Sequence, residues 1–213
     1  MSGCCYTGVQ SGCIFSKQSD GSSRAHLERG LQPEREIMAV LPILEYPNEI
    51  LRKTVAKETA VDEELIHLSQ DMAETMYAAP GVGLAAPQVG QLRRIIVLDC
   101  AREGEPADLL VAINPEILES EGEVCHSEGC LSIPGYYADV MRHAKIRARW
   151  LDVEGKEVVD TLEGLKAICF QHECEHLEGG LFIDHLSPLK RSLFRKKYKK
   201  HHQNRSDGEK GDT

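Results

Sequence analysis

Residues 162–180 read LEGLKAICFQHECEHLEGG and form the most informative stretch of this 213-residue chain. The stretch predicts a helix over residues 162–178, because the two glycines that follow are typical of a helix end. In that helix His172 and His176 lie one turn apart on one face, so both imidazoles can reach a single metal ion. The spacing therefore predicts a metal site on the helix.

Glu173 directly follows the first histidine, where its carboxylate can contact a metal-bound water without being a ligand. This arrangement suits hydrolysis, because the ion lowers the pKa of the water and polarises a carbonyl while the carboxylate moves the proton. Leu165 and Ile168 share the face of the histidines, so we expect that face to be partly buried. We therefore prefer a hydrolytic metal site to an accidental pair of exposed histidines.

A third protein ligand should come from upstream of the helix. Zinc proteases usually supply it downstream, for example through the last histidine of the HExxHxxGxxH motif. In this chain Phe182 stands at the position of that histidine. Beyond His185 the acidic residues all lie in a polar tail. Thiolate and imidazole are good ligands for zinc or ferrous iron. The upstream candidates, among which spacing alone does not choose, are Cys125, His126, Cys130 and Cys169.

Composition limits the classes of protein to consider. The chain is 41% hydrophobic, which is enough for a sizeable core, and no apolar run approaches the ~18 residues that span a bilayer. The first thirty residues lack the apolar centre of a secretory signal, so we expect a soluble, cytoplasmic protein without a membrane partner. The formal net charge of −9 argues against binding of nucleic acid by the whole surface, and we expect no sequence-specific nucleic-acid partner.

The order of predicted elements indicates an α+β fold, with small antiparallel sheets around the central HExxH helix and a helix at the C-terminus. Helices and strands are segregated rather than alternating, which favours antiparallel pairing. The expected elements are a helix capped by Asp62, strands at 93–99 and 111–114, a hairpin over 145–159 and a last helix capped by Ser187.

The chain is expected to consist of a flexible leader (1–37), a catalytic domain that includes the basic C-terminal helix (38–202) and a flexible tail (203–213). The leader shows no sustained apolar period, and Met38 opens a more protein-like stretch that we expect to be the biological start. In the last helix Leu189, Leu193 and Phe194 are the candidates expected to anchor the first turns to the domain.

The chain resembles the peptide deformylase family through three motifs, which occur in the order that the family shows. The similarity extends from about Met38 to Tyr198. The motifs are Gly81-Val82-Gly83-Leu84-Ala85-Ala86-Pro87-Gln88, Glu128-Gly129-Cys130-Leu131-Ser132 and Gln171-His172-Glu173-Cys174-Glu175-His176.

This resemblance implies a role for several residues of the site. The implied metal ligands are Cys130, His172 and His176. Glu173 would act as general base and then as general acid. Gln88 and the backbone N–H of Leu131 would donate hydrogen bonds to the oxyanion that develops in the reaction.

The resemblance also implies how the substrate binds. An extended peptide would pair with Val82 and Gly83 like an added strand. The residues expected to line the pocket for the methionine side chain are Leu165, Ile168 and Cys169. One departure is Tyr137, which stands where some members carry a basic residue at the rim.

By resemblance the chain is a metal-dependent hydrolase that removes the formyl group from the N-terminal formyl-methionine of nascent polypeptides and releases formate. The family implies ferrous iron, although a Cys-His-His site would also accept zinc, nickel or cobalt. It also implies docking to the ribosome through the basic helix 187–202. The competing interpretations are a general zinc peptidase and a structural metal-binding module, which would usually have four protein ligands.

Overall fold

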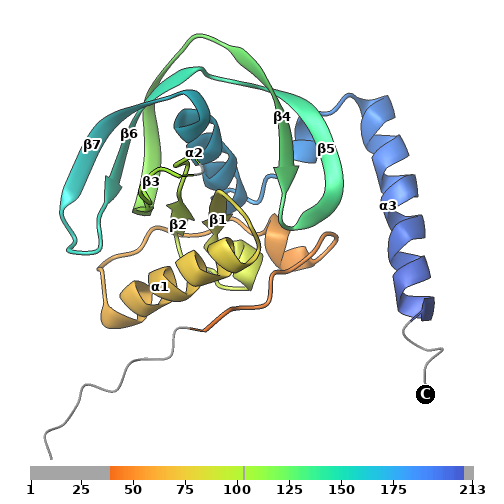
Figure 1. The fold of residues 1–213 in the computed structure, drawn as a ribbon, viewed down its shortest axis with the longest axis horizontal. Helices are drawn as coiled ribbons and strands as arrows, with labels where there is room; N and C mark the ends of the chain where they lie inside the picture. The colour runs from red at the N-terminus through yellow and green to blue at the C-terminus, as the bar shows by residue number, and fades with distance from the viewer. Residues whose placement is uncertain (1–38, 103, 209–213) are drawn as a thin grey trace, which may run out of the picture. The chain divides into compact units, whose positions relative to one another are not determined.

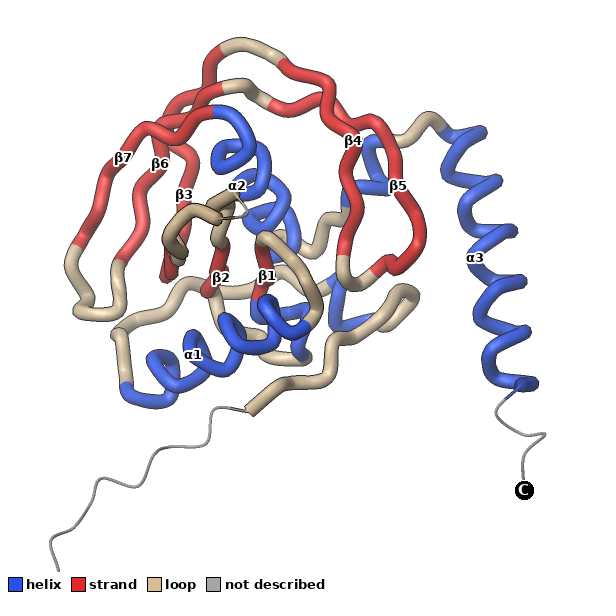
Figure 2. The backbone as a smooth tube through the Cα atoms, viewed as in Figure 1, coloured by secondary structure: helices blue, strands red, loops and turns tan. Residues whose placement is uncertain are grey.

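The computed structural model describes residues 39–102 and 104–208, and the side chains of residues 39–198 except that of residue 103. The predicted leader and Met38 lie outside the described residues. The described part contains both helices and antiparallel strands, so the predicted α+β class is confirmed. Figure 2 shows the strands on both sides of a central helix.

Five strands form the larger sheet, in the order β1-β2-β3-β6-β7, and every neighbouring pair is antiparallel. In β6 the alternating residues Ile146, Ala148 and Trp150 are buried, as the sequence predicts for one face of a strand. The strands of this sheet are β1 (Gly83–Ala85), β2 (Ile95–Leu98), β3 (Leu110–Glu121), β6 (Lys145–Leu151) and β7 (Glu157–Glu163).

Strand β3 is longer than predicted. Its second half is mostly exposed and carries only Ile117 and Leu118 among polar residues, so it lacks the alternating apolar pattern that identifies a strand in sequence. Pairing with β6 stabilises it instead: Glu116 and Glu119 form cross-strand ion pairs with Arg149 and Arg147 at 3.0 and 2.8 Å.

A separate hairpin of β4 (Val124–Cys130) and β5 (Ile133–Arg142) was not predicted. Its sequence mixes glycine, proline and charged residues, which are depleted in strands, and few of its side chains are buried. Backbone pairing along the length of β4 and β5, together with the contacts of the inner face, therefore stabilises the hairpin more than local strand propensity does.

Helix α2 (Gly164–Leu177) carries the HExxH stretch and lies inside the molecule (Figure 1). Phe170 is fully buried, and its ring centroid lies 5.7 Å from that of Trp150 of β6. Gly179 follows the C-cap residue Glu178, and its φ of +73° and close approach to the Arg52 carbonyl oxygen leave no room for a Cβ. Packing on the larger sheet thus fixes the position of α2.

The other helices cover the remaining core. Helix α1 (Glu63–Ala78) begins as predicted, because the Asp62 carboxylate accepts a hydrogen bond from Leu65 N at 2.8 Å. The 3₁₀ helices span Glu49–Arg52, Ala86–Val89 and Phe182–His185. Among the described residues, no helix combines the length and the apolar character needed to cross a membrane.

Helix α3 (Pro188–Gly208) is anchored by only one of the three expected residues, Phe194. Leu189 and Leu193 are 71% and 58% exposed, so the expected role of these two leucines as anchors is wrong. Phe194 is 2% exposed instead, and its ring packs against those of Tyr46 and Tyr136, with centroids at 5.6 and 4.6 Å. Sequence alone did not show which face of this basic helix is covered.

Truncation of this anchor should destabilise the protein. We expect Phe194→Ala to lower the free energy of unfolding by about 3–5 kcal/mol, because it opens a cavity in a buried aromatic cluster. Urea unfolding followed by circular dichroism measures the change. The neighbouring Leu193→Ala is the control and should cost less than about 0.5 kcal/mol, because Leu193 is mostly exposed. Equal losses in the two variants would contradict this account of the anchor.

Candidate metal centre

Three potential ligands meet where the end of β4 approaches α2. The ligand atoms of Cys130, His172 and His176 all lie within 4.8 Å of one another, and Cys130 Sγ is 3.3 Å from His176 Nε2. Spacing alone left the upstream ligand open, the family resemblance implied Cys130, and the fold brings Cys130 to the two histidines. Cys125 is exposed on the hairpin, and Cys169 Sγ instead donates to the Val82 carbonyl at 3.4 Å.

The geometry of this cluster fits a divalent transition metal. His172 Nδ1 lies 2.9 Å from Glu128 Oε2, so this contact leaves Nε2 as the nitrogen for a metal. Both histidines are buried, at 7% and 1% exposure. One thiolate and two imidazoles make a donor set that zinc, ferrous iron, nickel and cobalt accept. Three protein donors leave a coordination position for a reactant, as in catalytic sites.

A buried ion pair holds the hydrogen-bond partner of His172. Arg142 of β5 binds both carboxylate oxygens of Glu128, at 2.8 and 2.9 Å. Burial alone would raise the pKa of Glu128, but hydrogen bonds and charge from Arg142 and His172 lower it to about 2. Glu128 therefore stays ionised and fixes the orientation of the His172 ring.

The same arginine reaches the helix that carries the ligands. Arg142 Nη2 donates to Glu175 Oε2 at 2.8 Å, and Glu175 Oε1 lies 2.9 Å from His185 Nε2. In the sequence Glu128 stands out only as part of a motif, and no sequence signal pointed to Arg142. A buried carboxylate such as that of Glu128 needs a cationic partner, but no local sequence pattern identifies which arginine supplies it.

Glu173 lies beside the cluster and is 4% exposed. Burial raises its pKa to about 7, with a smaller raising effect from Glu128 and opposing effects from His172 and Arg142. Its Oε2 atom is buried and has no hydrogen-bond partner among the described residues. A carboxylate with such a pKa and a free oxygen can take up and release a proton near neutral pH.

Gln88 places a donor next to the cluster. Its Oε1 accepts from Ala85 N at 2.8 Å, which directs Nε2 toward Cys130 Sγ at 3.4 Å and Ser132 Oγ at 3.2 Å. Leu131 lies in the two-residue turn between β4 and β5, and its side chain packs against Gly81. Both predicted donor residues thus border the site, whereas the role of the Leu131 N–H stays a prediction.

The predicted peptide-binding segment lies at one of the two edges of the larger sheet. Strand β1 pairs with β2 and with no other strand of the described residues. Asp99 N donates to the Val82 carbonyl at 3.0 Å, so the next residue, Gly83, points its N–H and C=O away from β2. A Cβ on Gly83 would lie 2.7 Å from Cys169 Sγ and would collide with the Glu173 carboxylate. Glycine therefore allows this edge to approach the catalytic helix.

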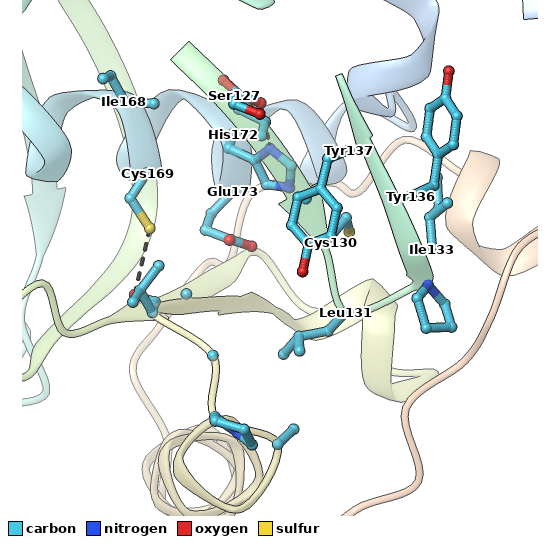
Figure 3. A pocket seen from close by; sticks show the side chains of 18 of the residues that line it. Ser127, Cys130, Leu131, Ile133, Tyr136, Tyr137, Ile168, Cys169, His172 and Glu173 are labelled. Atoms are coloured by element: carbon cyan, nitrogen blue, oxygen red, sulfur yellow. Dashed lines mark hydrogen bonds and ion pairs between the residues drawn. The ribbon is translucent and has the colours of Figure 1, made fainter. Parts of the chain in front are cut away.

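A cavity of about 500 Å³ opens beside these groups. Its walls include the residues predicted to surround the methionine side chain, which are Leu165, Ile168 and Cys169, and also Val82 of the predicted peptide-binding segment. Figure 3 shows Ile168 and Cys169 along α2 beside His172 and Glu173, with Tyr137 across the opening. Tyr137 is 72% exposed, and its ring covers Gly129 so closely that a Cβ there would lie 2.6 Å from Cε1.

Comparison of the sequence with known proteins points to one family. A family model described as polypeptide deformylase matches residues 40–192. A peptide deformylase of Syntrophobacter fumaroxidans is 49% identical over 163 residues, which cover 76% of this chain and 96% of the relative. One from Alkalilimnicola ehrlichii is 52% identical over 163 residues, which cover 76% of this chain and 91% of the relative.

The same family appears among solved structures. The crystal structure of a peptide deformylase from Legionella pneumophila is similar to this chain with a TM-score of 0.73 and 46% identity, over 79% of this chain and 98% of that one. Sequence, fold and the Cys-His-His cluster thus agree, and the chain belongs to the polypeptide deformylase family.

Proposed function

We propose that this enzyme removes the formyl group from the N-terminal formyl-methionine of nascent polypeptides and releases formate. The proposal is carried by the buried Glu173 oxygen, which has no hydrogen-bond partner among the described residues and lies beside a three-ligand cluster and an edge strand. Family membership supports the same activity. Turnover of formyl-Met-Ala but not of acetyl-Met-Ala tests it, and a general zinc peptidase would instead cleave internal peptide bonds.

The substrate backbone is proposed to extend the larger sheet at β1. Gly83 offers its N–H and C=O to the peptide, and the methionine side chain enters the cavity toward Ile168 and Cys169. Main-chain hydrogen bonds then fix the direction of the chain, while the cavity selects the side chain. This placement brings the formyl group next to Glu173.

A bound metal would be held by Cys130, His172 and His176 and would polarise the formyl carbonyl and acidify water. Glu173 accepts the proton of the attacking water and later delivers it to the leaving amine. Gln88 Nε2 and the N–H of Leu131 donate to the developing oxyanion. Because a formyl carbon bears only hydrogen, a narrow site favours it over an ordinary peptide carbonyl.

Ferrous iron is the proposed native metal, although zinc, nickel and cobalt suit the same donors. The thiolate and imidazole donors alone do not select one of these four ions. Metal analysis of protein purified without oxygen, together with activity per metal atom, identifies the ion. Loss of activity in air that added ferrous iron restores would support iron, and activity that depends on zinc alone would contradict it.

Replacement of the proton carrier should separate catalysis from metal binding. Glu173→Gln should lower kcat by roughly 10²–10⁴-fold, because general acid–base catalysis is lost, while metal content stays normal. The control is Glu163→Gln just before α2, where the carboxylate is 65% exposed and pairs with Lys145. Near-normal turnover of metal-loaded Glu173→Gln would remove Glu173 from the mechanism.

Two cysteines of the same hairpin should differ in their effect on the metal. Cys130→Ala should abolish stable metal binding, because its sulfur lies beside His176, whereas Cys125→Ala should leave binding intact, because Cys125 is exposed elsewhere on β4. Metal per protein after dialysis measures the difference, with circular dichroism as a check on folding. If Cys125→Ala loses the metal instead, the proposed ligand set is incorrect.

The enzyme is also proposed to act in the cytoplasm and to dock to the ribosome through the basic helix 187–202. Phe194 holds one face of α3 against the rest of the protein, while Arg195, Lys196 and Lys197 are exposed. Phosphate-directed attraction of this kind is sensitive to salt and does not read bases.

Charge reversal tests the docking. Changing Lys196, Lys197, Lys199 and Lys200 to Glu should lower co-sedimentation with ribosomes at low salt, because attraction to phosphate becomes repulsion. Deformylation of a short free peptide should continue, since these residues lie outside the proposed site. Unchanged co-sedimentation, or wild-type binding that ignores salt, would exclude this role.

A further inference from the structure

A second cavity, of about 390 Å³, lies between the β4–β5 hairpin and the first turns of α3; we call it the α3 groove. Figure 1 shows α3 beside β5, and Figure 3 shows Tyr136 and Tyr137 at the hairpin end of the metal-site cavity. The groove is lined by Ser127, Tyr136, Tyr137, Ala138, Asp139, Leu186, Lys190, Leu193, Phe194 and Lys197.

The α3 groove adjoins the metal-site cavity. Ser127, Tyr136 and Tyr137 line both spaces, so the two spaces lie next to each other on the hairpin. Tyr137 is 72% exposed, and its ring offers a large amphipathic contact to a ligand that extends from one space to the other.

The lining indicates what kind of ligand fits. Leu193, at 58% exposure, is an open apolar contact beside the buried Phe194, which keeps α3 in place. Lys190 and Lys197 bring two positive charges to the groove against the single carboxylate of Asp139. On a chain with a formal net charge of −9, this groove favours apolar and acidic side chains.

We propose that the α3 groove binds the substrate polypeptide downstream of its formyl-methionine and favours apolar and acidic residues there. The inference rests on the proposed function, because it requires the N-terminus of the peptide at the metal centre. An extended chain advances about 3.3–3.6 Å per residue, so a dipeptide or tripeptide ends near the first cavity and a longer peptide reaches the groove. The α3 groove is thus a second contact that only longer substrates use.

The test compares substrate lengths in variants of exposed residues. The substrates are formyl-Met-Ala-Ser and two peptides of roughly ten residues with the same start, one acidic and one lysine-rich after the third residue. The variant is Lys190→Glu with Lys197→Glu. Its matched control is Arg195→Glu with Lys196→Glu, which makes the same charge change on the same helix outside the groove.

For wild type, kcat/KM should be higher for the long acidic peptide than for the short one. The groove variant should lose roughly tenfold on the long acidic peptide, as expected when two surface charge contacts become repulsive, and should keep its activity on the short peptide. The control should keep both activities within about twofold. Equal losses in the variant and the control, or no loss in either, would overturn the proposal.

A second pair tests the apolar contact in the same way. Leu193→Ser should reduce the advantage of a long peptide with leucine or phenylalanine downstream, whereas Leu189→Ser, an exposed leucine outside the groove, should not. No difference between these two variants would also count against the groove. A wild-type enzyme that is inactive on formyl-Met-Ala-Ser would overturn the proposed function first, and this inference with it.

Discussion

The bidentate pairing of Arg142 with Glu128 joins the parts of the molecule on which the site depends. Arg142 lies on β5, Glu128 on β4, and the arginine also binds Glu175 of α2, at 2.8 Å. The second oxygen of Glu128 lies against Nδ1 of His172. One guanidinium therefore ties the hairpin that provides Cys130 to the helix that provides both histidines.

The value of this pairing lies in orientation more than in stability. Taking two charges out of water costs several kcal/mol, so a buried ion pair often contributes little net free energy compared with apolar residues of similar size. It does prevent other arrangements, because either partner alone would be a buried, uncompensated charge. The fold thereby keeps the imidazole of His172 in one tautomer and one direction, which metal binding requires.

The pKa values of two buried glutamates of the site are shifted in opposite directions, because their surroundings differ. Glu128 faces Arg142 and His172 and has a pKa of about 2, whereas burial dominates at Glu173 and raises its pKa to about 7. One carboxylate is thus a fixed charge, and the other exchanges protons. The free edge of β1 adjoins the second one, since only glycine at position 83 lets the strand approach Glu173.

The sequence by itself determined the HExxH helix, the α+β class and the capped start of α1, because local period, caps and motifs encode them. Only the tertiary structure decided that Cys130, which the family motif implied, meets the two histidines, that Arg142 supports Glu128, and that Phe194 anchors α3 while Leu193 stays exposed. It also decided the hairpin β4–β5 and the polar half of β3. These features depend on contacts between residues far apart in the chain, whose geometry no local pattern contains.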